Sequence, residues 1–171
     1  MTSALEELLE EHQVIKRLSS ALQWLSIRLG SNATIDEDFT SALLRLLDFV
    51  AKCHHAREEA IVFPAVEPFA QELVSSAVEE HRDFLSLSQA LKDAMTSGDL
   101  QAAYDLAGKV SSLLARHIEW EEASLFATAE AVLGEEVKRR IAERLSEPWE
   151  GCSLEEALRD SDAIFVSISG G

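Results

Sequence analysis

The sequence predicts an all-α protein, an up-down-up-down four-helix bundle with an internal two-fold repeat. Glycine and proline are scarce, at 7 and 3 of 171 residues, which favours helix throughout the chain. Four long stretches repeat apolar residues at the spacing of an amphipathic helix. The links between these stretches are short, so consecutive helices are expected to be antiparallel neighbours.

The first two helices are expected at residues 3–29 and 34–63. His12 sits in the middle of the apolar stripe of the first helix, and the stretch GSNAT ends that helix. Thr34 is the expected N-cap of the second helix, and Glu37, three residues later, would complete a capping box. Two prolines after residue 63 mark the end of the second helix.

The third and fourth helices are expected at residues 69–97 and 99–133. Gly98 is the expected C-cap of the third helix. His81 interrupts the apolar stripe of the third helix, as His117 does in the fourth. Each of the four helices therefore places a histidine on the face that should turn toward the core.

Residues 1–134 thus form the predicted bundle, and residues 135–171 form a C-terminal extension. The stretch EEVKRRIAERL predicts a short fifth helix. The tail after it contains one helical turn and a short run typical of a β-strand, at residues 164–168. We expect this extension to pack on the bundle or to mediate association between copies of the chain.

The two halves of the bundle also resemble each other. EEHQVIKRLSSAL from Glu10 and EEHRDFLSLSQAL from Glu79 are identical at seven of thirteen positions. HHAREEAIVFP from His54 and HIEWEEASLFA from His117 are identical at five of eleven. Each aligned pair keeps its histidine in register, so the sequence predicts a pseudo-two-fold axis between the halves.

Composition limits the partners and the compartment. The formal net charge of −16 argues against nucleic acid and anionic membranes as partners. The acidic start MTSALEELLEEH lacks the features of a secretory signal, and no apolar run is long enough to span a membrane, so the cytoplasm is expected. Two cysteines make no disulfide framework, and Cys53 is expected to serve packing alone.

The residues that suggest chemistry recur as H-x-x-x-E. Because the two residues are four apart, the histidine and the glutamate of each motif share one helix face. Glu59 and Glu122 follow one residue later and are rotated by about 100° from that face. The inward set is His12, His54, Glu58, His81, His117 and Glu121.

A metal ion explains this inward set best. A buried carboxylate is costly without a cation, and no inward lysine or arginine accompanies these two. A single histidine on an apolar stripe is more often a hydrogen-bonded core residue, but two motifs in register favour metal binding. His55 points off the stripe, which indicates a surface position or a role behind the ligands. Whether Glu122 replaces Glu121 as a ligand stays open.

The ligand types narrow the choice of metal. Nitrogen and oxygen donors without thiolate argue against an iron–sulfur cluster, and six ligands exceed what one tetrahedral zinc uses. Imidazoles and carboxylates from four helices are typical of a pair of irons, with manganese or zinc as alternatives.

These motifs make the chain resemble the hemerythrin-like (HHE cation-binding) domain family over roughly residues 5–130. The family has a histidine on the first and third helices and H-x-x-x-E on the second and fourth, where the second motif here continues into VFP. The resemblance implies a non-haem di-iron centre bridged by two glutamates and an oxo or hydroxo oxygen. From the count of ligands per iron, we expect O2, H2O2 or NO as the small-molecule partner.

One departure from the family pattern bears on function. The oxygen-carrying members have a second histidine on the third helix, four residues before or after the first, where this chain has Ala77 and Leu85. With two histidines for each iron, both irons should keep an open position, which favours redox turnover or sensing over reversible oxygen carriage.

Three classes of function remain open from the sequence. The chain could be a di-iron oxidoreductase acting on peroxide or NO, or a binding, storage or sensor module for O2 or iron. It could also be a helical bundle that acts through its surface, as a monomer or a homodimer. No P-loop, dinucleotide fingerprint or G-x-S-x-G motif points to other catalytic machinery.

Overall fold

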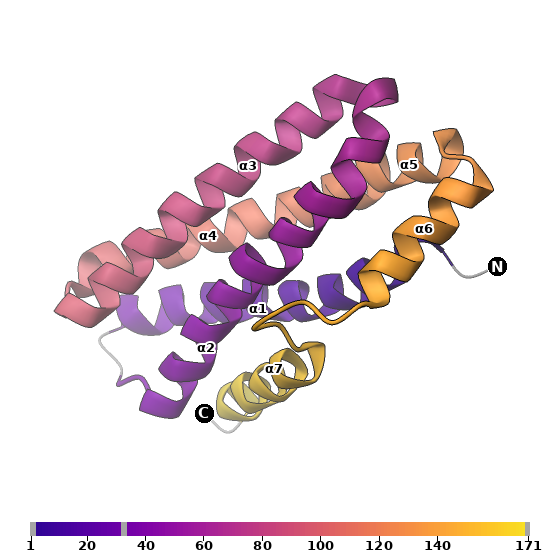
Figure 1. Cartoon of the computed structure of the whole chain (residues 1–171). Coiled ribbons are helices and arrows are strands. Elements are labelled where there is room, and N and C mark those ends of the chain that lie inside the picture. The colour runs from indigo at the N-terminus through magenta and orange to yellow at the C-terminus, as the bar shows by residue number, and fades with distance from the viewer. Residues whose placement is uncertain (1–2, 32–33, 170–171) are drawn as a thin grey trace.

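The computed structural model describes residues 3–31 and 34–169, and every regular element in these ranges is a helix (Figure 1). The predicted all-α class is therefore confirmed. None of the helices in this part of the chain combines the length and apolarity needed to cross a bilayer.

Four helical segments correspond to the four predicted helices. The first segment is α1 (Glu6–Gly30), and the second comprises α2 (Glu37–Phe49) and the π-helical turns η1 (Val50–His55) and η2 (Glu58–Val62). Helix α3 (Phe63–Ser97) follows directly and is kinked at Ala70, whose φ of −148° and ψ of 54° are not helical, so the third segment is the part of α3 after this kink. The fourth comprises α4 (Leu100–Trp120), the π-helical turn η3 (Glu121–Phe126) and α5 (Ala127–Val132). Helices α6 (Glu135–Ser146) and α7 (Leu154–Ser169) follow.

The ends of the segments follow from local backbone chemistry. Gly98 is the C-cap of α3, with the left-handed φ of 76° that glycine tolerates best, as predicted. The predicted capping box at Thr34 is wrong, because Asp36 is the N-cap of α2 and its carboxylate accepts a hydrogen bond from the backbone N–H of Asp38. A carboxylate at this position also interacts favourably with the positive end of the helix dipole.

Two apolar clusters fill the interior, and the histidines lie between them. In α1, Leu8 belongs to one cluster and Ile15 to the other, with His12 between the two. The same order holds around His81 in α3, where Ala77 and Phe84 belong to different clusters. The polar layer is therefore enclosed by apolar side chains along the helix axes.

The predicted β-type run at residues 164–168 is wrong, because these residues belong to α7, which packs against α1 and α2. Ile164 and Ile168 are four residues apart and contact the core, whereas Phe165 and Val166 are exposed. Helical spacing thus fits this run to the bundle better than strand alternation. Ion pairs between Arg45 and Asp160 and between Arg17 and Asp162 also join α7 to the bundle.

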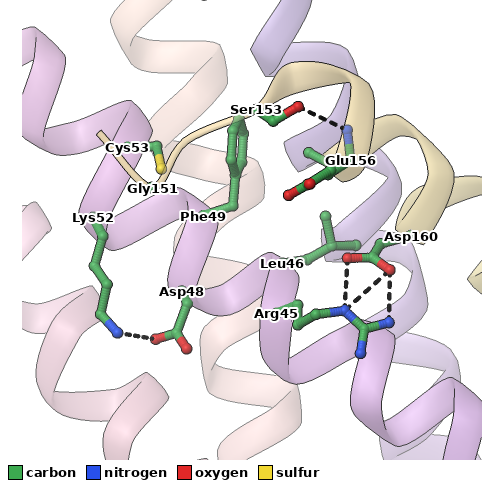
Figure 2. Close-up of a pocket in the computed structure, with 11 residues that line it drawn as sticks. Arg45, Leu46, Asp48, Phe49, Lys52, Cys53, Gly151, Ser153, Glu156 and Asp160 are labelled. Carbon is green, nitrogen blue, oxygen red and sulfur yellow. Dashed lines mark hydrogen bonds and ion pairs between the residues drawn. The ribbon is translucent and has the colours of Figure 1, made fainter. Parts of the chain in front are cut away.

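Cys53 is expected to serve packing and does lie in the core, but it also forms a disulfide with Cys152, which the sequence pattern does not predict. Cys53 lies in η1, and Cys152 lies in the connection between α6 and α7. Figure 2 shows Cys53 beside the loop at Gly151, at a pocket lined by both segments. The bond thus attaches the C-terminal extension to the turn that carries His54.

Removing the disulfide should destabilise the fold. The bond joins residues 99 apart in sequence, and closing a loop of this length restricts the unfolded chain. A variant with Cys53→Ser and Cys152→Ser should lose about 2–4 kcal/mol of unfolding free energy, measured by urea denaturation without reductant. Reductant should destabilise the parent protein similarly and leave the double variant unaffected, and equal stability of the two proteins would contradict the bond.

Candidate metal centre

The π-helical turns are where the predicted motifs lie. His54 and His55 belong to η1, Glu58 begins η2, and Glu121 begins η3. A π-turn closes i→i+5 hydrogen bonds, so it contains more residues than an α-turn and rotates less per residue. Two consecutive side chains of η1 can therefore both face the interior.

The widened turn explains why His55 is not on the surface. The rotation of an ideal α-helix places His55 off the inward face, but the structure buries it, with 3% of the residue exposed. Its ring stacks on that of His81, with centroids 3.7 Å apart, and meets Phe84 edge-on. Of the two positions expected for His55, the surface position is therefore wrong, and a role behind the ligands is not tested by its burial.

The structure brings the six predicted inward residues together, and all of them are buried. The two carboxylate oxygens of Glu58 lie 3.1 Å from His54 Nε2 and 3.3 Å from His81 Nε2. Glu121 Oε2 lies 3.4 Å from His12 Nε2 and 3.5 Å from His117 Nε2. Each carboxylate thus faces one histidine from each half of the sequence repeat.

The donor atoms form two groups, each compact enough to hold a metal ion. One group contains His12, His54, Glu58 and Glu121, and the other contains His55, Glu58, His81 and His117. Within each group the donor atoms lie within 4.8 Å of one another. Glu58 belongs to both groups, so its carboxylate lies between the two candidate positions.

Most of the donor atoms lack other partners, whereas Nε2 of His12 and Nε2 of His54 lie 3.1 Å from each other. Seven of the donor atoms are buried without any hydrogen bond: both carboxylate oxygens of Glu58 and Glu121, and Nε2 of His55, His81 and His117. A buried polar atom without a partner destabilises a fold by about 1–3 kcal/mol. Cations bound among these atoms would satisfy them together, so the site suits metal ions with nitrogen and oxygen ligands.

Every predicted histidine is also held from behind by a carboxylate. His12 Nδ1 lies 2.9 Å from Glu122, and His54 Nδ1 lies 2.8 Å from Glu11. The equivalent contacts of the other half are those of His81 Nδ1 with Glu59 (2.8 Å) and of His117 Nδ1 with Glu80 (2.7 Å). Since a neutral imidazole carries one proton, a proton held at Nδ1 leaves Nε2 free to bind a metal.

Sequence reasoning missed this supporting set, although its signal is visible. Glu11 and Glu80 directly precede the histidines of EEH, and Glu59 and Glu122 directly follow the inward glutamates of H-x-x-x-E. The doubled glutamates therefore have two separate positions. One glutamate of each H-x-x-x-EE faces the centre, and the next one reaches a histidine on another helix.

Without metal, burial and the interaction between the two central carboxylates shift their pKa values in opposite directions. Burial raises the pKa of Glu121 well above its usual range, and the charge of Glu58 adds to this shift. Burial opposes ionisation of Glu58 as well, but His54 and the other facing imidazoles outweigh it and hold the pKa of Glu58 well below normal. Glu58 is therefore the charged member of the pair.

The same interactions charge His54 in the metal-free protein. Burial lowers the pKa of His54, but the charge of Glu58 and the hydrogen bond with Glu11 outweigh it and raise the pKa to about 9. By contrast, burial lowers the pKa of His55 well below its ordinary value. Protons on some imidazoles thus supply the positive charge near Glu58.

The pKa of His54 predicts how the metal-free fold responds to pH. Because the folded pKa lies above the unfolded value of 6.5, protonated His54 stabilises the fold fully below pH 6.5 and loses this effect as the pH rises through about 9. Urea denaturation of chelator-treated protein should show unfolding free energy falling between these values, by an amount on the order of 3 kcal/mol. His54→Gln should flatten the dependence, and a parent stability that rises over this window would contradict the assignment.

Comparison with known proteins agrees with the geometry. A family model described as the hemerythrin HHE cation binding domain matches residues 3–129, which include all six predicted inward residues. No significant match was found among curated proteins. The matched residues make up most of the chain, and the buried histidine–glutamate groups lie inside them. The chain therefore belongs to the hemerythrin HHE cation-binding family.

Proposed function

We propose that this chain is a non-haem di-iron protein whose iron pair binds or reacts with O2, peroxide or NO, in redox turnover or in sensing. The observation that carries the proposal is the convergence of seven unpartnered buried donor atoms in two groups that share Glu58. Two positions sharing one carboxylate are what a bridged metal pair needs.

The proposed ligands follow from these groups. His12 and His54 hold one iron, and His81 and His117 hold the other. Glu58, which belongs to both groups, and Glu121 would bridge the two irons, which is supported by the way each carboxylate faces a histidine of both halves. Burial favours Glu121 over Glu122 as the ligand, because Glu122 is partly exposed and is already hydrogen-bonded to His12.

His55 changes the expected balance between the two irons. Its Nε2 is buried without a partner, and its ring lies in the group of His81 and His117. We propose that His55 gives this iron a third imidazole. The iron held by His12 and His54 then keeps the open position, whereas the sequence suggested an open position on both.

An iron pair bound here supplies one-electron redox steps and a coordination position for a small oxidant. The protein residues supply the shielding and orientation. Phe126 stacks on His12, with ring centroids 5.1 Å apart, and Phe63 stacks on His81. These apolar rings keep bulk water from the imidazoles and strengthen the electrostatic interactions among the ligands.

We also infer the architecture that holds the site. The pairing of supporting carboxylates with histidines across the repeat supports an up-down-up-down bundle of two related halves, within residues 1–134. Residues 135–171 form an extension attached to this bundle through the disulfide and α7.

Metal analysis and reactivity assays test the function. Protein purified under native conditions should contain about two irons per chain, since the donor atoms form two groups. Iron-loaded protein is then mixed with peroxide, with O2 and with NO. Sustained peroxide consumption supports an oxidoreductase, and a stable coloured adduct without turnover supports a binder or sensor. Protein that takes up no iron after anaerobic reconstitution refutes the proposal, and zinc or manganese in place of iron removes its redox part.

The bridging role of Glu58 predicts a paired loss. Glu58→Gln keeps the shape of the side chain and removes the charge that both positions share, so most of both irons should be lost together. The measurement is the iron content after anaerobic reconstitution and desalting. Glu67→Gln, which removes an exposed carboxylate of α3, should keep the parent iron content. Full occupancy in Glu58→Gln would exclude the bridge.

The role of His55 predicts an unequal loss. His55→Phe keeps an aromatic ring against His81 and Phe84 but removes the imidazole donor. One iron should then bind as in the parent while the other binds at least tenfold more weakly, about 1.4 kcal/mol. A competitive chelator titration that resolves the two affinities measures this effect. Unchanged affinities for both irons would make His55 a packing residue.

A further inference from the structure

The sequence repeat makes the four histidine–carboxylate contacts equivalent, but the charges behind the carboxylates differ. In the contact of His12, Lys16 Nζ donates to Glu122 at 2.9 Å. In the contact of His54, the buried guanidinium of Arg57 pairs with Glu11 and also with the more exposed Glu7. His12 and His54 belong to one donor group, which we call the first candidate position. Both are therefore held by carboxylates whose negative charge is partly neutralised by a cation.

The second candidate position, which contains His81 and His117, has no such cations behind its carboxylates. Glu59 and Glu80 hold His81 and His117, and within residues 3–31 and 34–169 no lysine or arginine lies within ion-pair distance of either glutamate. The repeat shows why. Leu85 stands where the first half has Lys16, and Trp120 stands where it has Arg57.

The presence or absence of a cation behind the carboxylate changes how strongly the imidazole donates electrons to a bound metal. A carboxylate at Nδ1 draws the ring proton toward itself and makes the imidazole a stronger electron donor, which favours the oxidised state of a bound metal. A cation on that carboxylate weakens the effect. The unbacked carboxylates also leave more negative charge near the second position, which favours its oxidised state by Coulomb attraction. Stronger imidazole donation and greater negative charge both lower the reduction potential of a metal at the second position.

We propose that Lys16 and Arg57 make the two irons electrochemically inequivalent, so that the iron held by His12 and His54 is reduced first. This proposal rests on the proposed di-iron function and assigns Lys16 as a positioning residue that acts through Glu122 and His12. The iron with the higher reduction potential is then also the one that His55 does not bind and that keeps an open coordination position. The first electron and the small ligand would therefore arrive at the same metal.

Lys16 is the residue on which to test this, because its side chain is 45% exposed and its removal leaves no cavity in the core. Lys16→Met removes the charge and keeps most of the chain length. Lys16→Arg keeps the charge. Lys109→Met removes one positive charge from an exposed position on α4 and controls for the change in net charge.

The experiment measures the two one-electron reduction potentials of iron-loaded full-length protein by spectroelectrochemistry, after iron content has been checked. In Lys16→Met the first potential should fall and the gap between the two steps should narrow. Lys16→Arg and Lys109→Met should behave as the parent protein. Added salt should narrow the gap in the parent and leave it nearly constant in Lys16→Met, because the Lys16–Glu122 pair is partly solvent-exposed.

The other outcomes overturn the proposal in distinguishable ways. Two bound irons with potentials unchanged in Lys16→Met refute the role of Lys16 and leave the di-iron function standing. A fall in the second potential instead of the first reverses the order of reduction and refutes the assignment of the first electron. Protein that binds no iron pair refutes the proposed function together with this inference.

Discussion

The rest of the structure depends on the burial of two carboxylates, Glu58 and Glu121, between two apolar clusters. An uncompensated charge in such an interior destabilises a fold by several kcal/mol, so the surrounding residues must supply positive charge or accept a metal. The imidazoles around the carboxylates do both. His54 carries a proton in the metal-free protein, and Nε2 of His55, His81 and His117 lacks any other partner.

The supporting glutamates turn this local requirement into a tie between helices. Each one comes from a neighbouring segment: Glu11 of the first holds a histidine of the second, and Glu59 of the second holds one of the third. Glu80 of the third segment and Glu122 of the fourth continue the series and return it to the first. The four contacts form a closed ring around the centre, so the orientation of each histidine depends on the packing of an adjacent helix.

The C-terminal extension reaches the same turn that carries His54. Cys152 binds Cys53 one residue before it, and the guanidinium of Arg57 donates to the backbone carbonyl of Leu145 in α6. The extension is thereby joined to the second segment by a covalent bond and a buried hydrogen bond. Disulfides are rare in reducing compartments, so the bond counts against the cytoplasmic location expected from the acidic N-terminus.

The sequence by itself determined the helical class, the inward histidines and the H-x-x-x-E glutamates, because helical periodicity fixes which residues share a face. Only the tertiary structure decided two kinds of feature: positions that depart from the α-helical period, and contacts with residues far away in the sequence. The π-turn places His55 in the interior. Residues 164–168 alone are typical of a β-strand, and they form part of α7 because helical spacing lets Ile164 and Ile168 pack on the bundle. The partners of Cys53 and His12 lie about a hundred residues away, where no local pattern specifies them.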